Sequence, residues 1–238
     1  MRPKIKICGF MNEADIDICL EIGAADILGF VTDYPLNVPW NLSKDRTLEL
    51  LKYTRNKSDI ECAMVTGGEI KKLIFLIDVI KPDYIQLHYK ENTKIITQVK
   101  EYSSIKIIKT VPNNLEDCIL QSGENSIEEC AKKFEQAGAD ILLVDSRQPS
   151  NVTEKSKFLD KNFFAKVKNS VKIPVMAAGG INPDNIKYVC DKLMPDYIDI
   201  MTGVEFSPGH KSKILLEKLK NRTNNYSQLL QQDYPIAR

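Results

Sequence analysis

The chain has few of the residues from which metal centres and disulfide frameworks are built. It contains two histidines and six cysteines in 238 residues, and no two cysteines form a CxxC pair. The usual zinc-ligand spacings are therefore absent, and we expect no metal site. Scattered single cysteines in a chain of this length are typical of a reducing compartment.

The sequence also lacks a strong net charge and a long hydrophobic run. Its 33 basic and 32 acidic residues leave a formal charge of +1, so no global field attracts nucleic acid or an anionic membrane. No apolar run approaches the length of a membrane span, and the first residues lead into a short predicted strand without the apolar segment of a signal peptide. We expect a cytoplasmic protein without nucleic-acid or membrane partners, in which local groups hold any anionic ligand.

Two further absences are the glycine-rich phosphate motifs GxGxxG and GxxxxGK[ST], which open many doubly wound sheets. What the chain has instead is an alternation of short β-rich runs with longer amphipathic runs, which is typical of a parallel sheet. The predicted strands are 4–8, 25–31, 59–65, 83–87, 105–110, 140–145, 172–177 and 196–201. The predicted helices are near 12–23, 44–56, 69–80, 92–102, 125–137, 159–169, 183–192 and 211–221.

Eight such units within about 220 residues fit the α/β class and a compact (β/α)8 TIM barrel, which typically needs about 250 residues. An open doubly wound sheet is the alternative. We predict one barrel domain over residues 1–222 and a C-terminal extension over 223–238, which either frays or docks on the barrel.

Cys8 ends the first predicted strand, in Lys6-Ile7-Cys8-Gly9. Active sites of barrels lie at the C-terminal ends of the strands, where a thiolate can serve as base or nucleophile. Free cysteines are also among the most buried residue types, so Cys8 taken alone is better explained as a small core residue, and only the segments that follow favour a role in chemistry.

Two glycine-containing turns follow the last two predicted strands. They include Gly179 and Gly180 after strand seven and Thr202 and Gly203 after strand eight. Glycines let backbone N–H groups approach an anion closely, and these loops often bind phosphate in barrels. The alternative is that they only make tight turns.

Asp145 ends the sixth predicted strand, where partial desolvation would raise its pKa and suit it to act as an acid. A loop cap bonded to backbone N–H groups is the alternative.

At the end of strand four, Gln86-Leu87-His88 places His88 where it binds substrate or orients a neighbour, whereas His210 is expected at the surface. Trp40 either closes over an aromatic ligand or packs, and Phe30 either floors the pocket or packs.

Taken in order, these segments resemble the phosphoribosylanthranilate isomerase family of tryptophan biosynthesis. The resemblance rests on Lys6-Ile7-Cys8-Gly9-Phe10, Gly23-Ala24-Ala25-Asp26-Ile27-Leu28-Gly29-Phe30-Val31, Gln86-Leu87-His88, Val144-Asp145-Ser146, Ala178-Gly179-Gly180-Ile181-Asn182-Pro183, and Gly203-Val204-Glu205.

The resemblance implies an aldose–ketose isomerase that performs an Amadori rearrangement of N-(5-phosphoribosyl)anthranilate by acid–base catalysis without a cofactor. Asp145 would be the acid that opens the ribose ring, and Cys8 the base that takes the proton from C2. Gln86, His88 and the two late turns would bind the phosphorylated sugar, in a monomer or a homodimer.

The chain departs from the family pattern in the loops that would face the aromatic part of the substrate. Asn37 stands about where a basic residue is expected, and Arg147 begins a segment that replaces a Gly-Gly-Thr-Gly motif. Arg147 could supply the missing cation. A paralogue acting on another phosphorylated sugar, or a non-catalytic phosphometabolite-binding barrel, is therefore the alternative.

Overall fold

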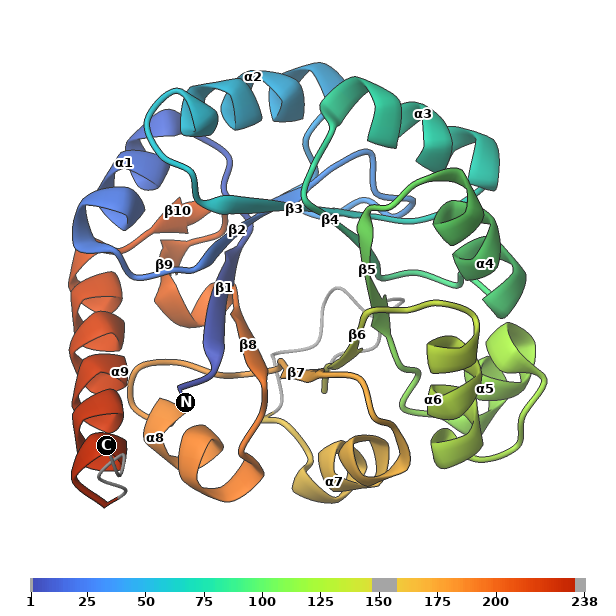
Figure 1. Cartoon of the computed structure of the whole chain (residues 1–238). Coiled ribbons are helices and arrows are strands. Elements are labelled where there is room, and N and C mark those ends of the chain that lie inside the picture. Colours follow the sequence, from blue (N-terminus) through green and yellow to red (C-terminus); the bar gives the residue numbers. More distant parts are fainter. Residues whose placement is uncertain (1, 147–157, 234–238) are drawn as a thin grey trace, which may run out of the picture.

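Eight parallel strands form a closed barrel in the order β1-β2-β3-β4-β5-β6-β7-β8, with helices around its outside (Figure 1). The computed structural model describes residues 2–146 and 158–233, with side chains described as far as residue 224. The strands are β1 (Lys4–Cys8), β2 (Ile27–Val31), β3 (Glu61–Thr66), β4 (Tyr84–Leu87), β5 (Lys106–Thr110), β6 (Ile141–Val144), β7 (Val175–Ala177) and β8 (Tyr197–Ile200). The predicted (β/α)8 barrel is confirmed.

The strands are largely apolar on both faces because each face is covered. Side chains that point inward fill the barrel, and their cluster comprises Ile27, Ala63, Tyr84, Ile108, Ile141, Leu143, Met176 and Ala178. Side chains that point outward join a larger core beneath the helices. This double burial explains the near-continuous apolar runs in the sequence.

The helices are α1 (Glu13–Ile22), α2 (Lys44–Arg55), α3 (Ile70–Ile80), α4 (Thr93–Tyr102), α5 (Leu115–Ser122), α6 (Ile127–Gln136), α7 (Lys161–Ser170), α8 (Ile186–Tyr188) and α9 (Lys213–Asp233). Several begin at a side-chain cap, in which Asn or Ser accepts a hydrogen bond from a backbone N–H in the first turn; Asn12, Ser43, Asn92 and Ser126 do so. Such caps define the helix starts locally, which is why the sequence indicates them.

Three elements differ from those predicted. Helix α5 was not expected, although Asn114 caps its start and Gly123 ends it. The helix predicted over 183–192 is a short α8 followed by a π-helical turn, Val189–Leu193. After β8 the chain forms a small hairpin of β9 (Glu205–Ser207) and β10 (His210–Lys211). Each is short, so periodicity over a longer window does not reveal it.

Four aspartates join neighbouring strands at the N-terminal end of the barrel. Each lies directly before an even-numbered strand and accepts a hydrogen bond from a backbone N–H of the preceding odd-numbered strand, at 2.7 to 2.8 Å. The acceptors are Asp26, Asp83, Asp140 and Asp196, and the donors are Ile5, Cys62, Ile107 and Val175. This repeated contact satisfies backbone groups at the strand starts and helps to set the register.

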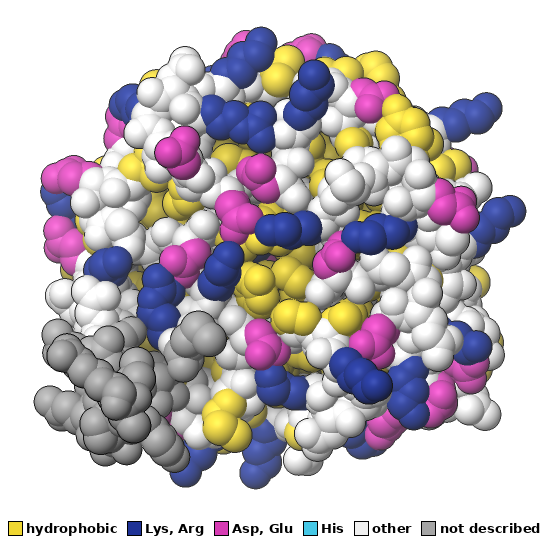
Figure 2. Space-filling view, viewed as in Figure 1, with side chains coloured by type: hydrophobic (Ala, Val, Ile, Leu, Met, Phe, Trp, Pro, Cys, Tyr) yellow, Lys and Arg dark blue, Asp and Glu magenta, His cyan; other side chains and the backbone are white. Residues whose placement is uncertain are grey.

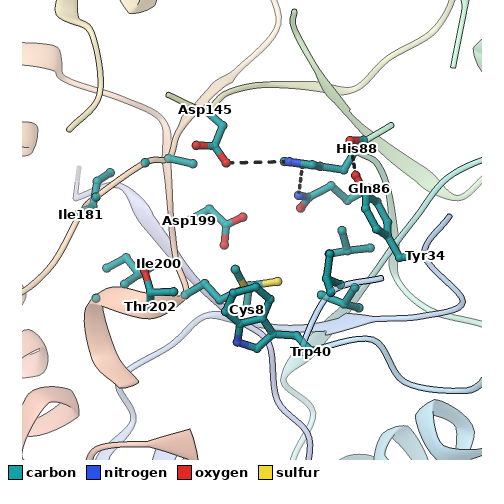
Figure 3. Close-up of a pocket in the computed structure, with 18 residues that line it drawn as sticks. Cys8, Tyr34, Trp40, Gln86, His88, Asp145, Ile181, Asp199, Ile200 and Thr202 are labelled. Carbon is teal, nitrogen blue, oxygen red and sulfur yellow. Dashed lines mark hydrogen bonds and ion pairs between the residues drawn. The ribbon is translucent and has the colours of Figure 1, made fainter. Parts of the chain in front are cut away.

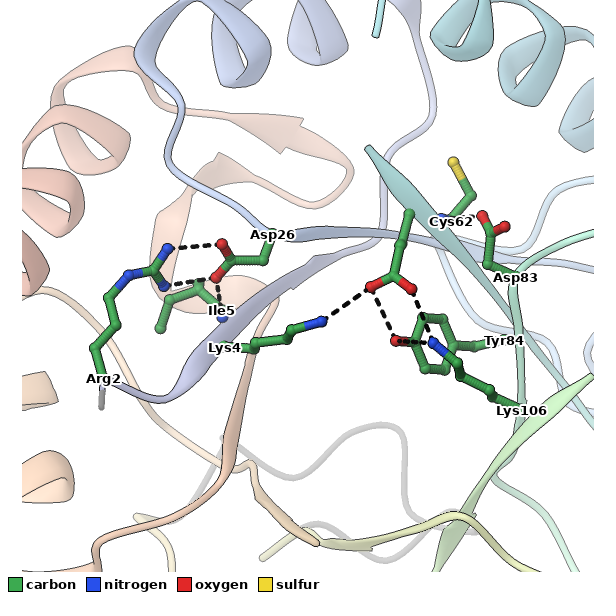
Figure 4. A network of polar contacts seen from close by, with 9 residues as sticks. Arg2, Lys4, Ile5, Asp26, Cys62, Asp83, Tyr84 and Lys106 are labelled. Carbon is green, nitrogen blue, oxygen red and sulfur yellow. Dashed lines mark hydrogen bonds and ion pairs between the residues drawn. The ribbon is translucent and has the colours of Figure 1, made fainter. Parts of the chain in front are cut away.

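Charged side chains also surround the same end of the barrel. Glu61 accepts hydrogen bonds from Tyr84, Lys106 and Lys4 at 2.9, 3.0 and 3.3 Å (Figure 4). In the view of Figure 2, hydrophobic side chains lie at the centre of the face and Lys, Arg, Asp and Glu side chains lie around them. These polar contacts lie at the N-terminal end of the barrel, whereas the candidate catalytic residues lie at its C-terminal end.

Helix α9 runs from Lys213 to Asp233 and so continues past residue 222, where the sequence predicts the domain to end. Thr223 is buried, so the helix is still packed at that point. Within residues 2–146 and 158–233, no helix has the length and apolar content needed to cross a membrane.

Candidate active site

A pocket opens at the C-terminal ends of the strands (Figure 3). Its empty volume, open mouth included, is about 820 Å³. The predicted site residues Cys8, Gln86, His88, Asp145, Gly179, Gly180, Thr202 and Gly203 all line it. The closed barrel thus brings together residues from five of its strands and the loops that follow them.

Cys8 is the last residue of β1, and it is 4% exposed. Burial raises the pKa of the Cys8 thiol above its usual value, and Lys6 and Lys211 oppose that shift while Asp199 adds to it. The two interpretations of Cys8 are therefore not exclusive. It is a buried thiol, and it lines the pocket.

His88 and Asp145 form another part of the wall. His88 Nε2 lies 3.9 Å from Asp145 Oδ2, while His88 Nδ1 lies 2.8 Å from Thr110 Oγ1 and 3.1 Å from Gln86 Nε2. The Tyr34 hydroxyl donates to the His88 carbonyl oxygen at 2.8 Å. The imidazole is thus held with Nε2 toward Asp145 (Figure 3).

The glycine turns after β7 and β8 are in contact with one another. A Cβ placed on Gly203 would lie 1.9 Å from the Ile181 carbonyl oxygen, and one on Gly179 would lie 2.1 Å from Ser146 Oγ. Gly179 and Gly180 also have φ values of +100° and +61°. Only glycine fits these positions without displacement, so the loops after β6, β7 and β8 converge on one corner of the pocket.

The helix that follows β7 begins later than expected. Helix α8 starts at Ile186, not near Pro183, and continues directly into the π-helical turn Val189–Leu193. Asn182 to Asn185 therefore separate the Gly179–Gly180 turn from the first helical residue. Backbone N–H groups of the turns are candidate donors to an anion.

An apolar wall lies on the side of the pocket built by the loop after β2. Trp40 is 7% exposed and packs in a cluster with Cys8, Val31, Tyr34 and Val65. Its indole Nε1 donates to both carboxylate oxygens of Glu205, at 3.1 and 3.2 Å. Trp40 therefore lines the pocket in a fixed orientation, as a surface suited to an aromatic ring.

Two other residues have structural positions. Phe30 is fully buried beside Phe10, with ring centroids 6.2 Å apart, so it packs in the core and is absent from the pocket wall. His210 is exposed on β10 and stacks on Phe206, in agreement with the expected surface position.

The sequence did not single out Asp199, which lines the pocket between Cys8 and Asp145 (Figure 3). It lies on β8, and Lys6 Nζ contacts both of its carboxylate oxygens at 2.9 and 2.8 Å. The available signal was the strand alternation, since Tyr197, Asp199 and Met201 share a face. An acidic residue on the inner face of a barrel strand points to the mouth or the interior.

Positively charged side chains are scarce here. Among the described residues that line the pocket, none is Lys or Arg. Asn37 is exposed and does not line it, and Arg147 lies outside the described residues. Over the same described ranges, no group of three or more His, Cys, Asp or Glu is arranged to hold a metal ion.

Comparison with known proteins identifies one family along most of the chain. The model of the family described as N-(5'phosphoribosyl)anthranilate (PRA) isomerase matches residues 5–222. An N-(5'-phosphoribosyl)anthranilate isomerase of Methanosarcina acetivorans is 27% identical over 222 residues, which cover 92% of each chain. N-(5'-phosphoribosyl)anthranilate isomerase 1 of Methanosarcina mazei is 26% identical over 209 residues, with 86% of this chain and 88% of the relative covered.

A solved structure gives the same fold. The crystal structure of phosphoribosyl anthranilate isomerase from Thermotoga maritima superposes with a TM-score of 0.75 at 22% sequence identity. The match covers 94% of this chain and 99% of the other.

Proposed function

This chain belongs to the N-(5'-phosphoribosyl)anthranilate isomerase family, and we propose that it catalyses the Amadori rearrangement of that substrate with Cys8 as base and Asp145 as acid. The single observation that carries the assignment of roles is the meeting of both residues in one pocket, beside the glycine turns after β7 and β8. One potential base, one potential acid and one potential anion site are the parts that this reaction needs.

The reaction begins with Asp145 in its protonated form. Asp145 gives its proton to the ribose ring oxygen, the bond from that oxygen to C1 breaks, and the nitrogen lone pair forms the C1=N bond of a Schiff base. His88, whose Nε2 faces Asp145, orients the carboxyl toward the ring.

Cys8 acts in the second step as a thiolate. It takes the proton from C2, and the electron pair of the broken C–H bond moves toward the iminium carbon to give an enolamine. The enolamine then gains a proton at C1 and loses one from the C2 hydroxyl, which gives the ketone. No atom is gained or lost overall, and the protein needs no cofactor in this scheme.

The sugar phosphate is bound at the converging turns. Backbone N–H groups around Gly180 and Gly203, with the Thr202 hydroxyl, are suited to bind its oxygens. The phosphate at this corner fixes one end of a small phosphorylated sugar, so its C1 and C2 lie between Asp145 and Cys8. Such fixing of the reacting atoms lowers the entropic part of the barrier.

The anthranilate ring binds against Trp40, Tyr34 and the valines beside them. Its carboxylate needs a cation, because a carboxylate that loses water without a partner costs several kcal/mol of binding. Since the described pocket lining offers no Lys or Arg, we assign this contact to Arg147, which follows Ser146 in the chain.

The direct test is turnover of N-(5'-phosphoribosyl)anthranilate by the purified protein, followed by the loss of the substrate's fluorescence. Conversion that Cys8→Ser and Asp145→Asn each abolish would support the activity and both roles. Absence of conversion by the folded wild-type protein would contradict the activity.

The lack of Lys and Arg in the described pocket lining also favours a second candidate, an isomerase of another phosphorylated sugar without the carboxylate. Arg147→Ala and Asn37→Arg separate the two. If Arg147 binds the carboxylate, Arg147→Ala raises KM sharply and Asn37→Arg partly restores it in that background. If wild type is inactive on this substrate and Asn37→Arg creates activity, the second candidate is favoured.

A further inference from the structure

Lys6 is a charged residue in the interior of the barrel, directly beneath the candidate base. It lies two residues before Cys8 on β1, so both side chains are on the inner face of the strand. Its side chain is 0% exposed, and that of its carboxylate partner, Asp199, is 9% exposed. Because an ammonium group is costly to bury, a charge in this position has to be held by its surroundings.

The space around Lys6 is shared with the thiol. A Cβ built on Gly29 would lie 2.8 Å from Cys8 Sγ and 3.0 Å from Lys6 Nζ. The sulfur and the ammonium group therefore both lie over the same glycine of β2, and no larger residue fits there without displacing one of them. Gly29 leaves open the space in which the two groups approach each other.

Other charged groups near Cys8 are paired. Lys211 Nζ donates to the Cys8 carbonyl oxygen at 2.5 Å and to Glu205 Oε1 at 2.6 Å. His88 and Asp145 are on the other side of the pocket (Figure 3). Lys6 and Asp199 are thus the two groups of opposite charge that reach the thiol from inside the barrel.

We propose that the Lys6–Asp199 pair sets the ionisation of Cys8, with Lys6 stabilising the thiolate and Asp199 limiting that effect. The inference rests on the proposed function, because it concerns the base of the reaction. Neither residue transfers a proton to substrate in this scheme, and both act through Cys8 as positioning residues.

The electrostatic environment agrees with this role. Burial tends to lower the pKa of Lys6, but Asp199 and Cys8 outweigh it and raise the pKa, so Lys6 remains charged. For the Cys8 thiol, burial raises the pKa, Lys6 lowers it and Asp199 raises it. The two members of the pair therefore act on the thiol with opposite signs.

Opposite signs give the proposal a distinctive test. Lys6→Met removes the cation and leaves the Asp199 carboxylate near the sulfur, so the pH of half-ionisation of Cys8 should rise by about one unit or more. Asp199→Asn keeps the size and an acceptor oxygen but removes the negative charge, so the same midpoint should fall. If the pair had a purely structural role, the two substitutions would shift the Cys8 midpoint in the same direction or would not shift it at all.

The measurement is the rate of alkylation of Cys8 by iodoacetamide as a function of pH, in the unliganded protein, with the modified peptide quantified by mass spectrometry. Lys109→Met is the matched control. It breaks another buried pair, in which Lys109 is 0% and Glu91 1% exposed at a separation of 3.7 Å, on the outer side of β5. It should lower stability and leave the Cys8 midpoint unchanged.

A second measurement does not depend on the pair variants folding. In the otherwise unaltered protein, the ¹⁵N resonance of Lys6 Nζ should shift at the pH at which Cys8 ionises, and Cys8→Ser should abolish that shift. Independence of the Lys6 resonance from Cys8 would overturn the proposal even if Lys6→Met and Asp199→Asn failed to fold.

The proposal is supported if the Cys8 midpoint rises in Lys6→Met, falls in Asp199→Asn and stays unchanged in Lys109→Met. Unchanged midpoints in the pair variants, or shifts of the same sign, overturn it. None of these measurements uses the substrate. An absence of turnover would therefore count against the proposed function alone. Normal turnover with midpoints that stay unchanged or shift in the same direction would count against this inference alone.

Discussion

Cys8 is a buried thiol in the wall of a pocket, and its surroundings set how readily it accepts a proton. The other five cysteines are buried as well. Burial raises the pKa of Cys19 to about 12, which keeps that thiol protonated at neutral pH. Cys8 differs in lining the pocket, and the Lys6 ammonium group lies in the space over Gly29 beside its sulfur. Position at the pocket, rather than residue type, distinguishes the candidate base.

Replacement of the sulfur should therefore stop the chemistry without loss of binding. We expect Cys8→Ser to lower kcat by roughly 10²-fold or more, because a hydroxyl is a far weaker base than a thiolate. Affinity for a phosphate-bearing product analogue, measured by isothermal titration calorimetry, should stay near that of wild type. Wild-type turnover in Cys8→Ser would show that another group is the base.

The pH dependence of the reaction should follow the same thiol. The base must be deprotonated to act, and burial raises the pKa of Cys8 above its ordinary value. The rate should consequently still be increasing with pH above about 8.5, the ordinary pKa of a cysteine. A profile of kcat/KM from about pH 6 to pH 10 would test this, and a rate that is flat or falling across the alkaline part, with the protein still folded, would contradict it.

At the scale of elements, the loops after β6, β7 and β8 act together because their backbones touch. The contact between Gly203 and the Ile181 carbonyl oxygen leaves no room for a side chain. This closeness places the N–H groups of two different loops at one corner, which neither loop could achieve alone. The phosphate site that we propose thus depends on how the loops are packed together.

We expect Gly203→Ala to force these loops apart and to weaken binding of a phosphate-bearing ligand by tenfold or more, about 1.4 kcal/mol. Gly123→Ala is the control. Gly123 ends α5 with φ of +79° and has no atom within 4 Å of an added Cβ, so its replacement should cost some stability and leave affinity unchanged. Equal losses of affinity in both variants would argue against the phosphate site.

At the scale of the whole molecule, the two ends of the barrel differ in what their residues contribute. The pocket lies at the C-terminal ends of the strands, and the four bridging aspartates lie at the N-terminal ends. In barrels of this kind, the first end is the catalytic one and the second contributes to stability. Changes at the second end should therefore affect the free energy of unfolding and spare the reaction.

Asp83 offers the simplest test, since it accepts the Cys62 N–H at 2.8 Å. Asp83→Ala should lower the free energy of unfolding by about 1–3 kcal/mol, because a buried donor loses its partner. Asp83→Asn retains an acceptor oxygen and should lose less. Urea denaturation measures both, and kcat/KM should stay at the wild-type value. A reduced kcat/KM in Asp83→Ala at unchanged stability would refute this division of tasks.

Low pH should reduce the contribution of Asp26 to the stability of the N-terminal end of the barrel. Burial tends to raise the pKa of Asp26, but its contacts with Arg2 and the Ile5 N–H outweigh that and lower it. A depressed folded-state pKa contributes stability that is present above the unfolded-state pKa and is lost as pH falls through the folded-state value. Since an unfolded Asp titrates near about pH 3.9, this contribution is complete at neutral pH and disappears in strong acid.

The sequence by itself determined the barrel and the members of the pocket wall that follow its strands. Alternating apolar strands and capped helices are local patterns, and eight such units favour a closed barrel over an open sheet. The ends of the strands then locate Cys8, His88, Asp145 and the glycine turns at one edge. These inferences need no knowledge of which residues meet across the barrel.

Only the tertiary structure decided which charges surround the thiol. Lys6 and Asp199 are 193 residues apart in the chain, and their pairing follows from the parallel register of β1 and β8, in which they are direct partners. The contact of Trp40 with Glu205 spans 165 residues and joins the loop after β2 to the hairpin after β8. Local periodicity shows that a side chain points inward, but the closure of the barrel and the register of its strands determine what it meets there.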